Sequence, residues 1–175
     1  MKNPAPKGNA GTDTGPAHIP LLPRHGIRLF VVDGDGPRFA NLFRETWQRL
    51  PLWARCRLLR YWRTPFCKGQ PRGMYPAFEL ISGKSDFFWR GDSGNAWGQC
   101  GMRGYSLAFA ADHLAEAGET ETRYTVAHEL AHVYMFAIKD PSHAGDDATA
   151  EWAHDLVDEQ LTEWGYDLDT RSWTP

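Results

Sequence analysis

The stretch Arg123-Tyr124-Thr125-Val126-Ala127-His128-Glu129-Leu130-Ala131-His132 decides how this sequence folds and which chemistry it can carry. It lies within residues 119–138, where apolar residues recur every three or four positions, a pattern typical of a helix. On a helix His128 and His132 lie one turn apart, with Cβ atoms about 5–6 Å from each other, so both imidazoles can bind one metal ion. Glu129 lies about 100° further round the helix, within reach of a water on that ion. The spacing therefore predicts two metal ligands and a general base, and the alternative is a pair of buried structural histidines.

A catalytic zinc site takes three protein ligands and one water, so a third ligand is required. The next predicted helix, residues 147–164, contains Glu151, and the distance from His132 leaves room for a loop and a returning helix. Glu151 is therefore the predicted third ligand, with His143 and His154 as its rivals. The alternative for Glu151 is the solvated face of an acidic helix.

The run Glu151-Trp152-Ala153-His154-Asp155 looks like the ExxxD pattern of gluzincins, a group within the HExxH zincins. That resemblance implies that Glu151 binds Zn²⁺ and that Asp155 holds a ligand histidine through its second ring nitrogen. Residues 104–165 most resemble the small bacterial metallopeptidases of the ImmA/IrrE type, although their second helix usually reads Glu-Ala-Asn or Glu-Ala-Asp before Phe-Ala. The second choice is a resemblance to SprT-type metallopeptidases, whose third ligand is a histidine, here His143.

The resemblance implies an α+β, zincin-like fold in which a small, few-stranded, twisted sheet packs on the HExxH helix. A pair of N-terminal helices and a C-terminal ligand-bearing helix complete the expected architecture. Hydrophobic periodicity places the two N-terminal helices at 38–50 and 52–63. The predicted strands are 27–32, 77–81, 87–90 and 105–110, the last three joined as hairpins, with residues 91–104 as a glycine-rich loop.

The activity that follows is zinc-dependent hydrolysis of peptide bonds through a metal-activated water, with Glu129 as the general base. An extended peptide substrate is expected to pair with the strand near 105–109. A group that stabilises the oxyanion is also needed, and the candidates are Tyr105, Tyr134, His143, His154 and Tyr166. The alternative function is a zinc-containing binding or accessory module without peptidase activity, against which the presence of Glu129 argues.

Composition indicates one folded domain. The chain has 175 residues, of which 42% are hydrophobic and 23% charged, and we expect a single domain over 24–175. Residues 1–23 are rich in Pro and Gly and predict a flexible tail, in which only 19–22 is apolar enough to dock as a strand. The sequence shows no run long enough for a membrane span or a secretory signal, and its three cysteines are an odd number. We therefore expect a cytoplasmic protein without membrane contact.

Charge is distributed unevenly along the chain. Between residues 38 and 72 there are nine Arg or Lys and one acid, whereas residues 140–169 hold ten acids and no Lys or Arg. The arginines alternate with Trp47, Trp53, Tyr61 and Trp62, a combination that can bind phosphates and stack bases. A nucleic-acid partner, as in a DNA-associated SprT-like protease, is therefore an alternative. The favoured interpretation is a solvated basic face or packing near the acidic C-terminal helix.

Overall fold

The computed structural model describes residues 17–64, 76–82, 98–101, 104–138 and 151–174, without the side chains of 101 and 151–153. These residues form a mixed α+β structure with a five-stranded sheet. No helix within these ranges is long and apolar enough to cross a membrane. The predicted strand 87–90, the candidate ligand His143 and most of the predicted loop 91–104 lie outside the described residues.

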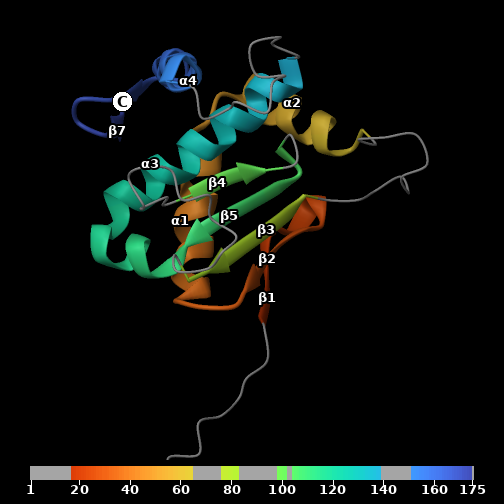
Figure 1. Ribbon diagram of the computed structural model, residues 1–175. Coiled ribbons are helices and arrows are strands. Elements are labelled where there is room, and N and C mark those ends of the chain that lie inside the picture. The colour runs from red at the N-terminus through yellow and green to blue at the C-terminus, as the bar shows by residue number, and fades with distance from the viewer. Residues whose placement is uncertain (1–16, 65–75, 83–97, 102–103, 139–150, 175) are drawn as a thin grey trace, which may run out of the picture.

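The sheet has the order β1-β2-β3-β5-β4 (Figure 1). Its strands are β1 (Ala17–Leu22), β2 (Ile27–Val31), β3 (Ala77–Ile81), β4 (Gly98–Gly101) and β5 (Ser106–Ala110). The three central strands β2, β3 and β5 run parallel, and the outer strands β1 and β4 are antiparallel to their neighbours. β3 matches the predicted 77–81, and β2 and β5 match their predictions within a residue.

Three expectations about the sheet are corrected. Within the expected tail 1–23, residues 17–22 form β1, which includes the segment 19–22 that the sequence allowed to dock as a strand, and Leu21 is fully buried against the core. Residues 98–101 of the expected loop form β4, the last strand of the sheet. The strands β3 and β5 are parallel neighbours rather than members of a hairpin, because a parallel pair needs a long connection and the chain passes through β4 between them.

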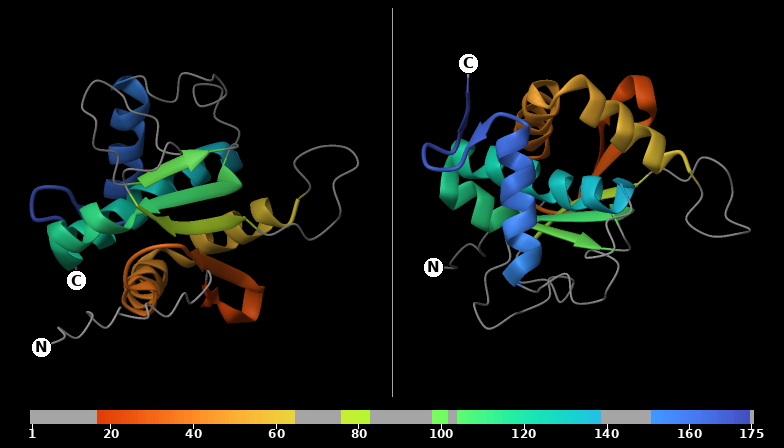
Figure 2. Two further views of the ribbon diagram at one scale, coloured as in Figure 1. Left: turned by 60° about the horizontal axis from the view of Figure 1, so that its bottom comes forward. Right: turned by 90° about the horizontal axis from the view of Figure 1, so that it is seen from above.

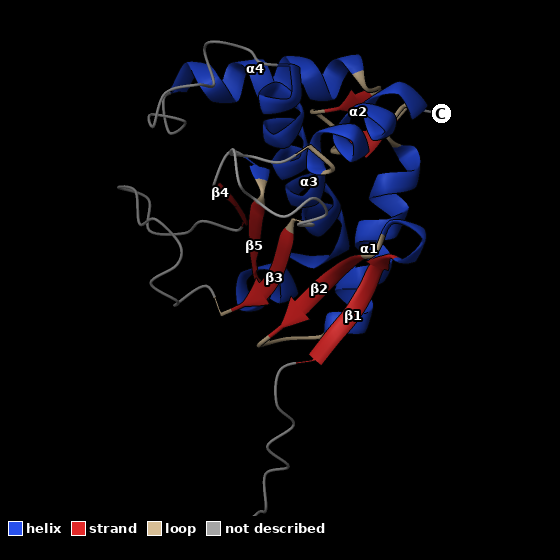
Figure 3. Cartoon of the chain, turned by 90° about the vertical axis from the view of Figure 1, so that its right-hand side faces the viewer, coloured by secondary structure: helices blue, strands red, loops and turns tan. Residues whose placement is uncertain are grey.

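Four helices accompany the sheet: α1 (Gly36–Arg49), α2 (Leu52–Trp62), α3 (Ala111–Ile138) and α4 (Glu151–Glu163). Helices α1 and α3 lie against the same face of the sheet (Figure 3). Helix α4 crosses α3 (Figure 2, right), and a short hairpin, β6 (Tyr166–Asp167) and β7 (Ser172–Trp173), follows it. Helix α3 begins before the predicted residue 119, but Gly118 at φ 87° interrupts it, so the predicted segment is its regular second part.

Aromatic side chains fill the space between the sheet and the helices. Phe43 of α1 and Trp62 of α2 both meet the ring of Phe78 on β3, with ring centroids 5.3 and 5.6 Å away. Trp62 also donates a hydrogen bond from Nε1 to the carbonyl of Gly104, at 2.9 Å. The end of α2 is thereby fixed to the segment that enters β5, and β5 leads directly into α3, which carries the HExxH residues.

Candidate metal centre

Helix α3 positions the residues of the HExxH motif where its regular second part passes beneath β4 and β5. Contacts join α3 to both strands. Glu129 and His132 are buried, with only 5% and 7% of their surface exposed, and His128 is partly exposed. Apolar neighbours Val126, Leu130 and Val133 are fully buried and hold this part of the helix in the core. The burial of these apolar side chains therefore fixes the rotation of α3 about its axis, and with it the direction in which the HExxH side chains point.

The two imidazoles of α3 point toward each other. The Nε2 atoms of His128 and His132 are 3.1 Å apart, and their ring centroids are 4.8 Å apart. Two nitrogens that each lie 2.0–2.1 Å from a tetrahedral zinc ion are separated by about 3.3 Å. The pair thus already has nearly the spacing of two ligands on one ion, as the helical i, i+4 relationship predicts.

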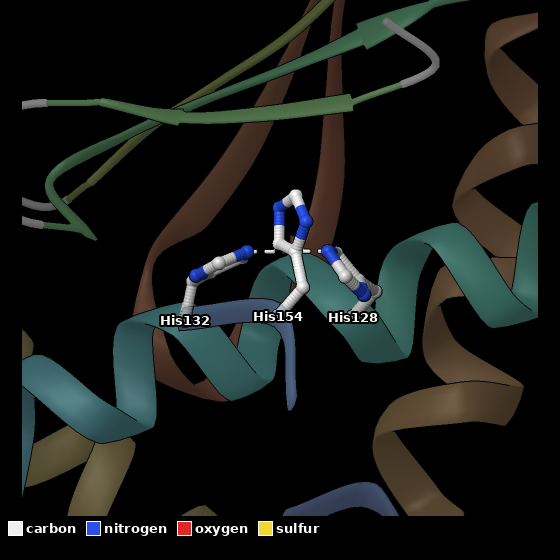
Figure 4. Close-up of side chains that lie close together, drawn as sticks. All are labelled: His128, His132 and His154. Atoms are coloured by element: carbon white, nitrogen blue, oxygen red, sulfur yellow. Dashed lines mark hydrogen bonds between the residues drawn. The ribbon is translucent and has the colours of Figure 1, made fainter. Parts of the chain in front are cut away.

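A third imidazole reaches this pair from α4. The ring of His154 lies 5.5 Å from that of His128 and 5.7 Å from that of His132, measured between centroids. One ring nitrogen of each of the three histidines lies within 4.8 Å of the others, a separation at which the set can hold a metal ion. Figure 4 shows His154 between and above the two histidines of α3. His154 is exposed, so the cluster opens to solvent on its side.

The chemistry of the donors fits zinc. Burial, together with the neighbouring His154, lowers the pKa of His128 from its ordinary value of 6.5 to about 4. His128 is therefore neutral at physiological pH, which is the form that binds metals. Its Nδ1 is buried and has no hydrogen-bond partner among the described residues. Three imidazoles are also a ligand set that zinc accepts in catalytic sites, with a fourth position left for water.

Glu129 lies between α3 and β4 and not among the three imidazoles. Burial raises the pKa of its carboxyl to about 8, although a hydrogen bond from the backbone N–H of Cys100 lowers it in part. The carboxyl therefore belongs to a water-poor part of the site, where a proton is held more strongly than on an exposed glutamate. Such a raised pKa is suited to a group that exchanges protons near neutral pH.

The other predicted ligands have different outcomes. Glu151 is the first residue of α4, three positions before His154, and its side chain is not among those described. Its assignment as a ligand stays a prediction, as does that of His143. His154, a rival in the sequence analysis, is the residue found beside His128 and His132. Asp155 is exposed and forms no hydrogen bond with any of these three histidines among the described side chains.

Asp158 is a residue beside the cluster that the sequence pattern did not single out. This residue lies one turn after His154 on α4, and its Oδ1 atom is buried without a hydrogen-bond partner in the described part of the chain. Burial raises the pKa of Asp158, and the neighbouring His154 opposes that increase. The signal was present in the sequence, because His154 and Asp158 have the same i, i+4 spacing as Glu151 and Asp155.

Two tyrosines proposed as oxyanion donors are engaged elsewhere. The hydroxyl of Tyr105 donates to the carbonyls of Tyr61 and Thr64 at the end of α2. The ring of Tyr134 packs edge-on against Trp53 and Trp164. Of the remaining candidates that the structure describes, Tyr166 is buried and His154 is in the cluster. A tyrosine that was not predicted, Tyr124, lies one turn before His128 with its ring centroid 5.7 Å from that imidazole.

Comparisons with family models, curated proteins and solved structures yield no match to this chain.

Proposed function

We propose that this protein is a zinc-dependent hydrolase of peptide bonds, built on a zincin-like arrangement of helix and sheet. The observation that carries the proposal is the meeting of three imidazoles, His128, His132 and His154, above the helix α3 that also carries the buried carboxyl of Glu129. A purely structural zinc site needs no such base and usually has closed, cysteine-rich coordination. The neutral imidazole of His128 and the raised pKa of Glu129 together support catalysis over simple metal storage.

Each residue has a separate role in this proposal. His128, His132 and His154 hold the metal through ring nitrogens, and zinc bound there supplies Lewis-acid polarisation of a carbonyl and an activated water. Glu129 takes the proton of the attacking water and delivers it to the leaving amine. The pKa of Glu129, about 8 without metal, falls beside a divalent cation, which leaves the carboxylate ionised when the proton must be accepted.

The substrate is an extended peptide in this proposal. The sequence placed it along residues 105–109, but β5 is an inner strand, flanked by β3 and β4. Among the described residues, β4 is the last strand of the sheet, and its Gly98 and Cys100 approach Glu129. A peptide lying along β4 in the manner of an added strand would therefore bring its backbone next to the general base, with affinity supplied by main-chain hydrogen bonds.

Zinc analysis of purified variants tests the metal site. We expect about one zinc per chain in the wild-type protein and a clear loss in His128→Ala, His132→Ala and His154→Ala. His18→Ala is the matched control, since His18 is exposed on β1 and is not part of the cluster. Glu151→Ala is measured beside them: full zinc in this variant supports His154 as the third ligand. Full zinc in His154→Ala with loss in Glu151→Ala would instead support the gluzincin assignment.

Peptide cleavage separates a hydrolase from a zinc-containing binding module. Glu129→Gln keeps the shape of the side chain and removes the base. We expect its zinc content to stay near that of the wild type while cleavage of an unstructured protein substrate falls by about 10²-fold or more. Equal cleavage rates in the wild type and Glu129→Gln, at equal zinc content, would refute the proposed role of Glu129.

A further inference from the structure

A second concave site shares no residue with the cluster of His128, His132 and His154. It is formed by the end of β1, the short 3-10 helix η1 (Pro23–His25) and the middle of α1. The strand β1 and the helix α1 pack side by side (Figure 3). The cavity has a volume of about 300 Å³, and its lining includes Leu22, Pro23, Arg24, His25, Arg44 and Trp47.

Two arginines line this cavity, Arg24 from η1 and Arg44 from α1. A third, Arg63 at the end of α2, donates a hydrogen bond from a terminal nitrogen to Nδ1 of the lining residue His25 at 3.3 Å. A guanidinium can only donate, so Nδ1 of His25 is the acceptor and the ring proton lies on Nε2. His25 therefore presents an N–H donor together with the arginines.

Arg44 is held in place within α1. Its Nε donates to the carbonyl of Ala40 at 2.8 Å, and one terminal nitrogen donates to Oδ1 of Asn41 at 3.0 Å. These two bonds fix the plane of the guanidinium without neutralising its charge. A cation that is oriented before a ligand arrives loses less conformational entropy when it binds.

No carboxylate balances these charges among the described residues. The acids of residues 17–64 are Asp33, Asp35 and Glu45. Asp33 and Asp35 accept hydrogen bonds from backbone N–H groups at the start of α1, and Glu45 is paired with Arg123 of α3 at 2.8 Å. Within the described part of the chain, Arg24, Arg44 and Arg63 thus form no ion pair.

We propose that this cavity binds an organic phosphate monoester of about the size of a mononucleotide. A phosphate monoester carries nearly two negative charges at pH 7 and offers three acceptor oxygens, which suits several guanidinium groups, whereas one arginine already satisfies a carboxylate. The apolar side chains Leu22, Pro23 and Trp47 form the floor for the rest of the ligand. A cavity of about 300 Å³ is at the lower end of ligand sites and limits the ligand to a small molecule.

Isothermal titration of the full chain with adenosine monophosphate, inorganic phosphate and adenosine tests this site. We expect saturable binding of the monophosphate, weaker binding of inorganic phosphate and none of adenosine. Arg24→Gln and Arg44→Gln should each weaken monophosphate binding about tenfold or more, the usual effect of losing a hydrogen bond to a charged group. The side chain of Arg24 is exposed and forms no ion pair or hydrogen bond within the described part of the chain, so its substitution should leave the fold intact.

The matched control is Arg49→Gln, which removes the same charge from α1 outside the cavity and should bind as the wild type does. Equal weakening in Arg49→Gln would reveal general charge attraction and overturn the proposal. The proposal would also be overturned if no ligand bound saturably, or if the monophosphate bound no more tightly than inorganic phosphate. Tight binding of single-stranded DNA that the monophosphate does not displace would assign the basic surface to nucleic acid instead. None of these titrations requires zinc. The His154→Ala variant should bind the monophosphate as the wild type does, because His154 does not line the cavity.

Discussion

A Cβ atom on residue 98 would lie 2.8 Å from Cγ and 2.9 Å from Oε1 of Glu129, so glycine at this position is what allows β4 to approach the carboxyl. The same Cβ would lie 2.9 Å from Cγ2 of Thr125, one turn earlier on α3. Two residues along β4, the backbone N–H of Cys100 donates to Glu129. The strand therefore both encloses Glu129 and orients it.

Substitution Gly98→Ala should separate β4 from α3 or displace Glu129. Because two of the three contacts involve γ carbons close to the helix backbone, we expect a loss of about 1–3 kcal/mol in the free energy of unfolding, as for other overpacked sites. Hydrolysis should fall more than zinc content. Denaturant unfolding and metal analysis measure both effects. Gln99→Ala is the control, since adjacent residues of a strand point to opposite faces; a stable, fully active Gly98→Ala protein would contradict the role given to this glycine.

The pH dependence of the metal-free protein should reveal the buried carboxyl. The pKa of Glu129 is about 8 in the folded chain, against its ordinary value of 4.5 when unfolded. The folded state therefore binds one proton more between these values, and stability falls as pH rises toward 8. His128 has a pKa of about 4 when folded and 6.5 when unfolded, so the unfolded state is the one that binds an extra proton between these values. The effect of His128 is therefore to lower the stability of the fold as pH falls below 6.5.

Between pH 6.5 and 8, Glu129 binds a proton in the folded state and not in the unfolded state, whereas His128 is neutral in both. A change of stability with pH in this window therefore tests Glu129 rather than His128. With chelator present, the wild-type protein should lose up to about 1.4 kcal/mol per pH unit relative to Glu129→Gln in this window, the slope becoming smaller as pH 8 is approached. Denaturant unfolding at several pH values gives the slope. Glu116→Gln, an exposed acid on the same helix, should behave as the wild type does. Parallel pH profiles for the wild type and Glu129→Gln would show that the carboxyl titrates normally.

Asp158 should matter more to metal binding than Asp155. Asp158 combines a buried, unpartnered Oδ1 atom with a position one turn from His154, whereas Asp155 is exposed. A carboxylate beside a metal-binding imidazole fixes its orientation, and its loss usually costs 10–100-fold in metal affinity. We therefore expect such a loss in Asp158→Asn and little change in Asp155→Asn, measured by zinc competition with a chelating dye. The reverse order would restore the role that the gluzincin resemblance implies for Asp155.

The parts of this structure that depend on local sequence were predictable. The i, i+4 spacing of His128 and His132 and the apolar period of α3 are properties of one helix, so the pair could be predicted before any tertiary structure was known. The extents of β2, β3 and β5 followed from short apolar runs bounded by turn residues. In each of these, the residues that interact are close together in the chain.

Relationships between distant segments were not predictable in the same way. A strand's pattern does not reveal which neighbour it pairs with, so the parallel pairing of β3 and β5 was missed. The glycine-rich β4 lacks the apolar alternation of a strand because Gly98 must accommodate Glu129. The approach of His154 depends on how α4 crosses α3, and several residues of α4 offered a donor at suitable spacing.

The N-terminal strand should be an integral part of the folded domain. Leu21 of β1 is fully buried in the main core, and β1 pairs antiparallel with β2 over most of its length. Truncation of a buried leucine leaves a cavity and typically costs 2–5 kcal/mol. We therefore expect Leu21→Ala to lower the free energy of unfolding by about this amount, whereas His18→Ala, on an exposed position of the same strand, should change it by less than about 0.5 kcal/mol. Denaturant unfolding compares the two variants. Equal stability of Leu21→Ala and the wild type would mean that β1 detaches without loss to the core, as the composition of the first 23 residues first suggested.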